Sequence, residues 1–305
     1  MNIKLQERDL SLLKTILRYG VLSTKQITSL CFANIAQTTV LRRLRLLQEA
    51  GVLINCGHLS DGAKVWSISK LGCKMINEKP PFRFSNRNTH QHDVCLVNVR
   101  LALESMGLSD NWTSEFEMKR NVLVYNRQDR IIPDGVFVAE LNGETHIIAL
   151  ELELHAKSHA RYRNLFIDYT FKDAISLIWY VVKDESIIKP ILKEWRGIEA
   201  EGKRWNHPQK IIFCIYNDLV KNKLDAKIMN DAGEFRTIES LINFEKPSQP
   251  LSTQTVENLE NANTEIQNKN KDFGPLPKLK SKPLPPSTPP HQHQGDVVES
   301  TATWS

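Results

Sequence analysis

The stretch RIIPDGVFVAELNGETHIIALELELHAK, residues 130–157, decides the fold of this chain because it reads as two β-strands joined by a tight turn. The first strand covers residues 131–141 and the second covers residues 145–155. Asn142 and Gly143 lie between them, and both residue types tolerate the positive φ that a two-residue hairpin turn needs. The sequence therefore predicts an antiparallel hairpin at this position.

The second strand carries two acidic residues on one face. Side chains in a strand alternate between faces, so Glu151 and Glu153 share the face opposite an apolar row. Neighbouring carboxylates repel each other and resist burial unless a positive group lies between them. Asp134 on the first strand could point to the same position, and converging carboxylate oxygens favour Mg²⁺ or Mn²⁺. The alternative is an ordinary solvated face of a sheet, and the stretch alone leaves both interpretations open.

Composition is typical of a globular protein and permits a nucleic-acid partner. The chain has 305 residues, 41% hydrophobic and 25% charged, with a formal net charge of +5. This length allows one or two domains with their own cores, and the mild positive charge permits DNA binding without requiring it. The five cysteines form no CxxC pair, which indicates reduced thiols in a cytoplasmic protein. No apolar run approaches the roughly 18 residues that span a bilayer, so we expect no membrane segment.

Residues 1–78 have the pattern of a winged helix-turn-helix domain. Helical periodicity recurs over residues 4–20, 24–31 and 38–51, and two short β segments follow. In this plan the third helix enters the DNA major groove and the β segments form a wing. The candidate DNA contacts are polar or basic residues of that helix and of the wing: Gln37, Thr38, Thr39, Arg42, Arg43, Arg45 and Lys64. A winged helix used for dimerisation or protein docking is the alternative.

The rest of the chain divides into three parts. Residues 79–89 predict a linker, because Pro80 and Pro81 forbid a continuing helix. Residues 90–245 alternate helices with strands, so we expect a mixed α/β (α+β) fold. Residues 246–305 are rich in Pro, Ser, Thr, Gln and Asn, which predicts a disordered tail with polyproline II character.

Two acidic and two histidine side chains precede the hairpin in the second domain. Residues 112–120 predict a strand in which Glu115 and Glu117 share one face. His90 and His92 begin a helix. We do not interpret this pair as the histidine–hydrophobic–histidine metal motif of rolling-circle endonucleases, because the residue between them is polar and the pair does not lie in a strand. A histidine near the mouth of an active site stays open.

The order of helices and strands in residues 90–245 resembles the PD-(D/E)xK nuclease core. Pro133-Asp134 matches its first acidic element, and Glu151-Leu152-Glu153 occupies the (D/E)xK position. A winged helix ahead of such a core is similar to the replication-relaxation family, in particular to MobC-type plasmid relaxases. The resemblance leaves the Pro-rich tail outside.

This resemblance implies a metal-dependent endonuclease that nicks double-stranded DNA at a plasmid transfer origin and so starts conjugative mobilisation. It implies that Asp134 and Glu151 hold Mg²⁺ or Mn²⁺ with help from the Leu152 carbonyl. Glu153 would be a further ligand or would orient the attacking water, and Glu115 or Glu117 could complete the ligand set. A separate possibility, outside the resemblance, is an adaptor in which the Pro-rich tail recruits accessory mobilisation or coupling proteins.

One departure from the family pattern is Glu153, which stands where the pattern has lysine. Lys157 or Lys172 could supply the missing positive charge as part of the catalytic set, and the alternative for both is a surface position. Tyr162 and Tyr169 on the following helix are expected to be packing residues. The rival function is a non-catalytic DNA-binding plasmid replication or mobilisation accessory protein with a decayed nuclease fold.

Overall fold

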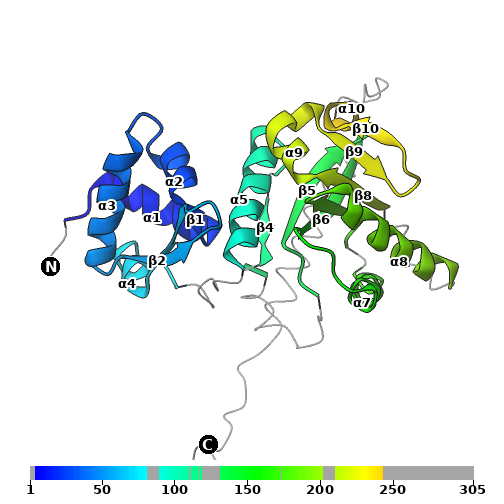
Figure 1. The fold of residues 1–305 in the computed structure, drawn as a ribbon, viewed down its shortest axis with the longest axis horizontal. Coiled ribbons are helices and arrows are strands. Elements are labelled where there is room, and N and C mark those ends of the chain that lie inside the picture. Colours follow the sequence, from blue (N-terminus) through cyan, green and yellow to red (C-terminus); the bar gives the residue numbers. More distant parts are fainter. Residues whose placement is uncertain are drawn as a thin grey trace, which may run out of the picture. The chain divides into compact units, whose positions relative to one another are not determined.

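The computed structural model describes residues 4–80, 89–109, 111–115, 117–118, 131–172, 174–201 and 210–242. Most of the predicted linker, residues 119–130 and the predicted tail lie outside the described residues. Helices and strands alternate along the chain, which confirms the mixed α/β class (Figure 1). None of the helices in the described ranges is both long enough and apolar enough to cross a membrane.

The N-terminal region contains helices and a small antiparallel sheet in the predicted order. Its strands β1, β2 and β3 pair in the order β1-β3-β2. The elements are α1 (Glu7–Tyr19), β1 (Leu22–Ser23), α2 (Thr24–Cys31), α3 (Gln37–Glu49), β2 (Leu53–His58), β3 (Lys64–Ile68) and α4 (Lys70–Met75). Ser23 caps α2, because its side chain accepts a hydrogen bond from the Gln26 N–H while the Gln26 side chain accepts one from the Ser23 N–H.

The second region is built on a mixed sheet. Among the described residues its strand order is β10-β9-β8-β7-β6-β5-β4. The strands are β4 (Thr113–Ser114), β5 (Gly135–Leu141), β6 (Glu144–Glu153), β7 (Leu177–Val182), β8 (Lys210–Ile215), β9 (Lys227–Asn230) and β10 (Phe235–Thr237). β6 pairs with β7 and β7 with β8 in parallel, and the other pairs are antiparallel. All six residues of β7 are buried, as the apolar run in the sequence predicts.

Helices cover both faces of this sheet (Figure 1). Helices α5, α9 and α10 contribute to the core on one face, and α7 and α8 contribute to the core on the other. Their bounds are α5 (His90–Ser105), α7 (His159–Tyr169), α8 (Ile188–Ala200), α9 (Tyr216–Asn222) and α10 (Ile238–Ile242). Because helices lie on both sides, all residues of β6 from Ile148 to Glu153 are buried. The interpretation of Glu151 and Glu153 as a solvated face is therefore wrong, since both are buried on the α7 side.

The hairpin of β5 and β6 has the predicted turn. Asn142 and Gly143 have φ of 53° and 75°, values that a two-residue hairpin turn requires. The register runs from the pair Leu141 and Glu144 to the pair Gly135 and Leu150. One further step along this register places Asp134 opposite Glu151.

The predicted strand over residues 112–120 is wrong. β4 contains only Thr113 and Ser114, and the described residues that follow are helical at Glu115 and Glu117. The reason is local: the Glu117 carboxylate accepts hydrogen bonds from the N–H and the hydroxyl group of Ser114, each at 2.8 Å, which closes a turn instead of extending the strand.

Helix α5 contributes apolar side chains to two cores. Val94 and Val97 belong to clusters formed with the N-terminal helices and strands, whereas Val99 and Leu103 belong to the core of the large sheet. The side chain of Gln26 also donates hydrogen bonds to the Val94 carbonyl at 2.9 Å and to the Asn98 side chain at 2.8 Å. The predicted boundary at residues 79–89 stays a prediction.

Candidate functional site

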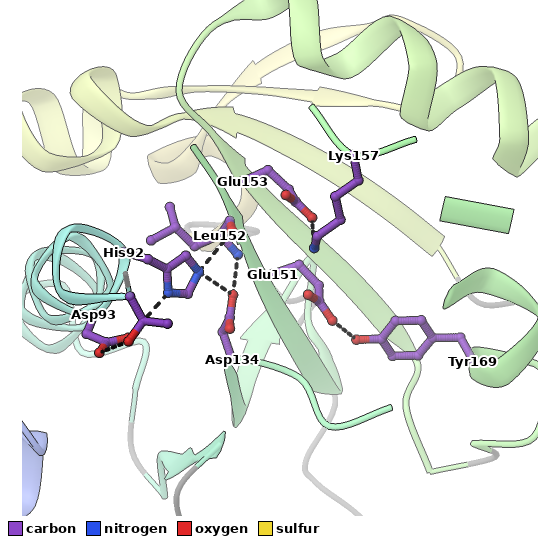
Figure 2. A network of polar contacts seen from close by, with 9 residues as sticks. His92, Asp93, Asp134, Glu151, Leu152, Glu153, Lys157 and Tyr169 are labelled. Atoms are coloured by element: carbon purple, nitrogen blue, oxygen red, sulfur yellow. Dashed lines mark hydrogen bonds and ion pairs between the residues drawn. The ribbon is translucent and has the colours of Figure 1, made fainter. Parts of the chain in front are cut away.

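The carboxylate of Asp134 extends the sheet beyond the first residue of β5. Asp134 Oδ2 accepts a hydrogen bond of 2.8 Å from the Leu152 N–H, which lies past the last paired residues of the hairpin (Figure 2). An additional strand residue would normally satisfy this N–H. The carboxylate is therefore fixed near the plane of the sheet, at the end of the hairpin.

His92 reaches the same point from the first turn of α5. Its Nε2 atom lies 3.2 Å from Asp134 Oδ2 and 3.1 Å from the Leu152 carbonyl oxygen (Figure 2). Burial alone would lower the pKa of His92, but hydrogen bonds and charge interactions with Asp134 and Asp93 outweigh it and raise that pKa to about 11. As long as no metal ion occupies this point, the two oxygen acceptors therefore favour the protonated imidazole.

Glu151 points toward α7, where it contacts a tyrosine. The hydroxyl group of Tyr169 donates a hydrogen bond of 2.5 Å to Glu151 Oε1, and both side chains are buried (Figure 2). Burial, together with the negative charge of Asp134, raises the pKa of Glu151 to about 8, against the opposing effect of Lys157. A carboxyl group in this environment lacks a full countercharge.

Glu153 is paired with Lys157. The Lys157 ammonium group, four residues further along, forms an ion pair with the Glu153 carboxylate (Figure 2). Burial raises the pKa of Glu153, and the charge of Lys157 opposes that shift. The Lys157 main chain is also fixed, because its N–H donates a hydrogen bond of 3.0 Å to the Tyr162 hydroxyl oxygen. Lys157 is therefore held beside Glu153 and is only partly exposed, and its catalytic role stays a prediction.

A comparison with models of protein families identifies the family of this chain. The model of the replication-relaxation family matches residues 13–172, which is more than half of the chain. This chain belongs to the replication-relaxation family. The match indicates a role in plasmid replication or mobilisation. No curated protein and no solved structure matches the chain.

In this replication-relaxation protein, the predicted site residues of the hairpin gather in one network. Asp134, Glu151, Glu153 and Lys157 lie inside the family match and interact with one another or through shared partners. Glu115 is joined to this network through the main chain, because its N–H donates a hydrogen bond of 3.2 Å to the Asp134 carbonyl. Its role as a metal ligand stays a prediction.

Side chains alone do not form a ready-made metal cluster in the part of the chain that the structure describes. No group of three or more His, Cys, Asp or Glu side chains within the described ranges is arranged to hold a metal ion. Near Asp134, one of the three converging polar atoms belongs to the main chain at Leu152. A donor set that includes a main-chain oxygen is not a cluster of three side chains, and the predicted metal site stays a prediction.

The predicted DNA contacts of this family member differ in exposure. Arg43 is engaged inside the N-terminal region, where its Nε donates a hydrogen bond of 2.9 Å to Asp9 and a second nitrogen forms a short ion pair with the same carboxylate. Burial would raise the pKa of Asp9, but Arg43 and the Gln6 N–H lower it overall. Lys64 is half-buried, and the remaining candidates are exposed: Gln37, Thr38, Thr39, Arg42 and Arg45.

Sequence reasoning missed two members of the network. The position of His92 at the start of a helix was noted, but nothing in the pattern indicated that α5 carries its imidazole to the Leu152 carbonyl. Tyr169 was expected to be a packing residue, and it instead donates a hydrogen bond to a buried carboxyl group. The available signal was general: a buried tyrosine usually finds a hydrogen-bond partner.

Proposed function

We propose that this protein is a metal-dependent DNA-nicking enzyme that acts at a plasmid transfer origin and starts mobilisation. The observation that carries the proposal is the meeting of Asp134, Glu151 and the Leu152 main chain at the end of the β5–β6 hairpin. The order α5–β4–β5–β6–α7–β7 supports it, because this is the order of the PD-(D/E)xK core that the sequence resembles. The family match agrees with a role on plasmid DNA.

The residues at the hairpin end fit a divalent cation. Asp134 Oδ2 and the Leu152 carbonyl oxygen both face one point, which the His92 imidazole reaches. The raised pKa of the nearby Glu151, caused by burial and by Asp134, is the behaviour of a carboxyl group that lacks a cation. When bound there, Mg²⁺ or Mn²⁺ would stabilise the negative charge that develops on a phosphate.

Glu153 stands where the family pattern has a lysine, and Lys157 supplies the positive charge that this lysine would carry. The ammonium group forms an ion pair with Glu153 and interacts electrostatically with Glu151. It is thus placed to hold a phosphate oxygen or to orient a water molecule, as the lysine of the (D/E)xK pattern would. Glu153 in turn fixes the position of this lysine.

The N-terminal region would bring duplex DNA to this site. Its order of helices and strands is that of a winged helix-turn-helix, with α3 as the recognition helix and β2 and β3 as the wing. Thr38, Thr39, Arg42 and Arg45 are exposed on α3, where they could reach bases or phosphates.

A nicking assay tests the proposal. A supercoiled plasmid that carries the DNA flanking this protein's coding sequence is incubated with the protein and Mg²⁺ or Mn²⁺, and open-circular product is measured. Asp134→Asn and Lys157→Ala are expected to reduce nicking by about 100-fold or more. Glu140→Gln, which changes an exposed carboxylate on the same hairpin, should nick as the wild type does. Equal nicking by all four proteins would exclude these residues from catalysis.

One observation favours the rival function. Each of the three carboxylates in the network already has a protein partner: Asp134 has His92, Glu153 has Lys157 and Glu151 has Tyr169. A decayed nuclease that only binds DNA could retain such pairs for stability. Specific binding of the same plasmid DNA by the wild type, with no open-circular product under either metal, would favour this accessory role.

A further inference from the structure

We propose that His92 is a ligand of the divalent cation at the hairpin end, together with Asp134 and the Leu152 carbonyl. The inference rests on the proposed function, because it concerns the same cation. It adds a ligand from α5 that neither the sequence motif nor the family match assigns.

The distances support this role. His92 Nε2 lies 3.2 Å from Asp134 Oδ2 and 3.1 Å from the Leu152 carbonyl oxygen. Adjacent ligands of an octahedral cation lie about 3.0 Å apart when the metal–ligand bonds are about 2.1 Å long. The two distances from His92 Nε2 are therefore close to those between neighbouring ligands, and a small outward movement of the imidazole would admit a cation.

The directions of approach support it as well. His92 comes from α5, which packs on one face of the sheet, and Glu151 points toward α7 on the other face (Figure 2). Asp134 and the Leu152 carbonyl lie between them at the end of the hairpin. A cation held by Asp134, Leu152 and His92 would lie beside Glu151, whose carboxyl group could join from the opposite side.

The imidazole would change which metal binds. Mg²⁺ prefers oxygen ligands, whereas imidazole nitrogen suits transition metals, so a site with His92 should favour Mn²⁺ over Mg²⁺. Without His92 the remaining ligands are oxygen atoms, and this preference should weaken. Asp93 is placed to orient the imidazole from behind, because its Oδ1 lies 3.6 Å from His92 Nδ1.

Metal binding can be measured without any cleavage. Mn²⁺ is titrated into the full-length protein without DNA, and the free ion is followed by its electron paramagnetic resonance signal, with Mg²⁺ as competitor. Electron spin echo modulation then tests for nitrogen coordinated to the bound ion. The variants are His92→Gln, which keeps a hydrogen-bond donor for Asp134, Asp134→Asn, and the control His159→Gln, whose histidine is exposed and pairs with Glu194.

We expect nitrogen modulation in the wild type and in His159→Gln, and its loss in His92→Gln. Mn²⁺ affinity should fall by about tenfold or more in His92→Gln, with a smaller change for Mg²⁺, and Asp134→Asn should bind neither ion. Mn²⁺ bound equally well by His92→Gln, or bound by the wild type without nitrogen modulation, would overturn the role of His92 and leave the proposed function standing. A wild type that binds no Mn²⁺ would overturn both.

Discussion

Tyr169 and Tyr180 flank the buried carboxyl group of Glu151, but only Tyr169 donates a hydrogen bond to it. The Tyr169 hydroxyl group lies 2.5 Å from Glu151 Oε1. Tyr180, which is paired with Glu151 across β6 and β7, has a buried hydroxyl group with no hydrogen-bond partner among the described residues. The two tyrosines therefore allow a controlled comparison, because only one of them has a hydrogen bond to lose.

Tyr169→Phe should destabilise the protein by about 1–2 kcal/mol, because it leaves the buried Glu151 carboxyl group without its donor. Tyr180→Phe should be neutral or slightly stabilising, since its hydroxyl group has no hydrogen bond to lose. Urea unfolding followed by circular dichroism measures both. Similar losses in the two variants would contradict the assignment of Tyr169 as the donor.

Glu151→Gln should alter the dependence of stability on pH. Burial and Asp134 raise the pKa of Glu151 from 4.5 to about 8. Between these values the unfolded chain has lost the proton and the folded protein retains it, so wild-type stability falls as the pH rises and levels off above about pH 8.

The variant cannot ionise at this position, so the free energy of unfolding should lose that downward slope and exceed the wild-type value above about pH 8. Urea midpoints between pH 5 and pH 9, taken about one unit apart, measure the difference. Glu140→Gln is the control, because Glu140 is exposed on β5. A wild-type slope that survives in Glu151→Gln would mean that another group controls it.

Gly135→Ala should disturb the start of β5. A Cβ atom at Gly135 would lie 2.3 Å from a ring atom of Trp112, a buried side chain that is stacked on Phe137. Either the ring or the strand must move, which we expect to cost about 1–3 kcal/mol. Because Asp134 is the preceding residue, Mn²⁺ affinity should fall as well.

Gly197→Ala is the matched control for this change. Gly197 lies in α8, and a Cβ atom there would meet nothing within 4 Å. Alanine should therefore stabilise the helix by about 0.5–1 kcal/mol and leave Mn²⁺ affinity unchanged. Thermal unfolding compares the two variants, and equal effects would remove the steric argument at Gly135.

Arg42→Ala and Arg43→Ala should separate DNA binding from stability on the same helix. Arg43 forms an ion pair with the fully buried Asp9, so its loss should cost about 3 kcal/mol of unfolding free energy. Arg42 is exposed, and its loss should change stability by less than about 0.5 kcal/mol.

For DNA binding we expect the opposite, with the larger effect in Arg42→Ala. If Arg42 contacts phosphate, its removal lowers the slope of log affinity against log salt concentration by about 0.9. Fluorescence anisotropy with a labelled duplex, measured at a temperature where both variants are folded, gives this slope. An unchanged slope in Arg42→Ala would remove Arg42 from the predicted contacts.

The pattern of apolar residues was sufficient to predict the main helices and strands. The Asn142-Gly143 turn and the Ser23 cap are local signals, because neighbouring residues in the sequence satisfy them. The buried strand β7 was also predictable, since a run with no polar face needs cover on both sides. These features depend on short-range chemistry that a single sequence contains.

Contacts between distant residues were not predictable in the same way. His92 and Leu152 are sixty positions apart, and their meeting depends on how α5 packs against the sheet. Arg43 was predicted to contact DNA because it lies on α3. Its actual partner, Asp9, lies on another helix, so the sequence around Arg43 gave no sign of this ion pair. The residues after Ser114 were predicted to continue a strand because polar and apolar side chains alternate there. The turn that Ser114 and Glu117 close could not be seen in this pattern.

Because α5 packs into two cores, it limits how this protein can be divided into fragments. A fragment that begins at residue 90 would retain the hairpin, yet it would expose Val94 and Val97 to water, because their cover comes from the first eighty residues. Freed apolar side chains of this kind invite aggregation. The region that carries the hairpin is therefore best produced and assayed with the first eighty residues attached.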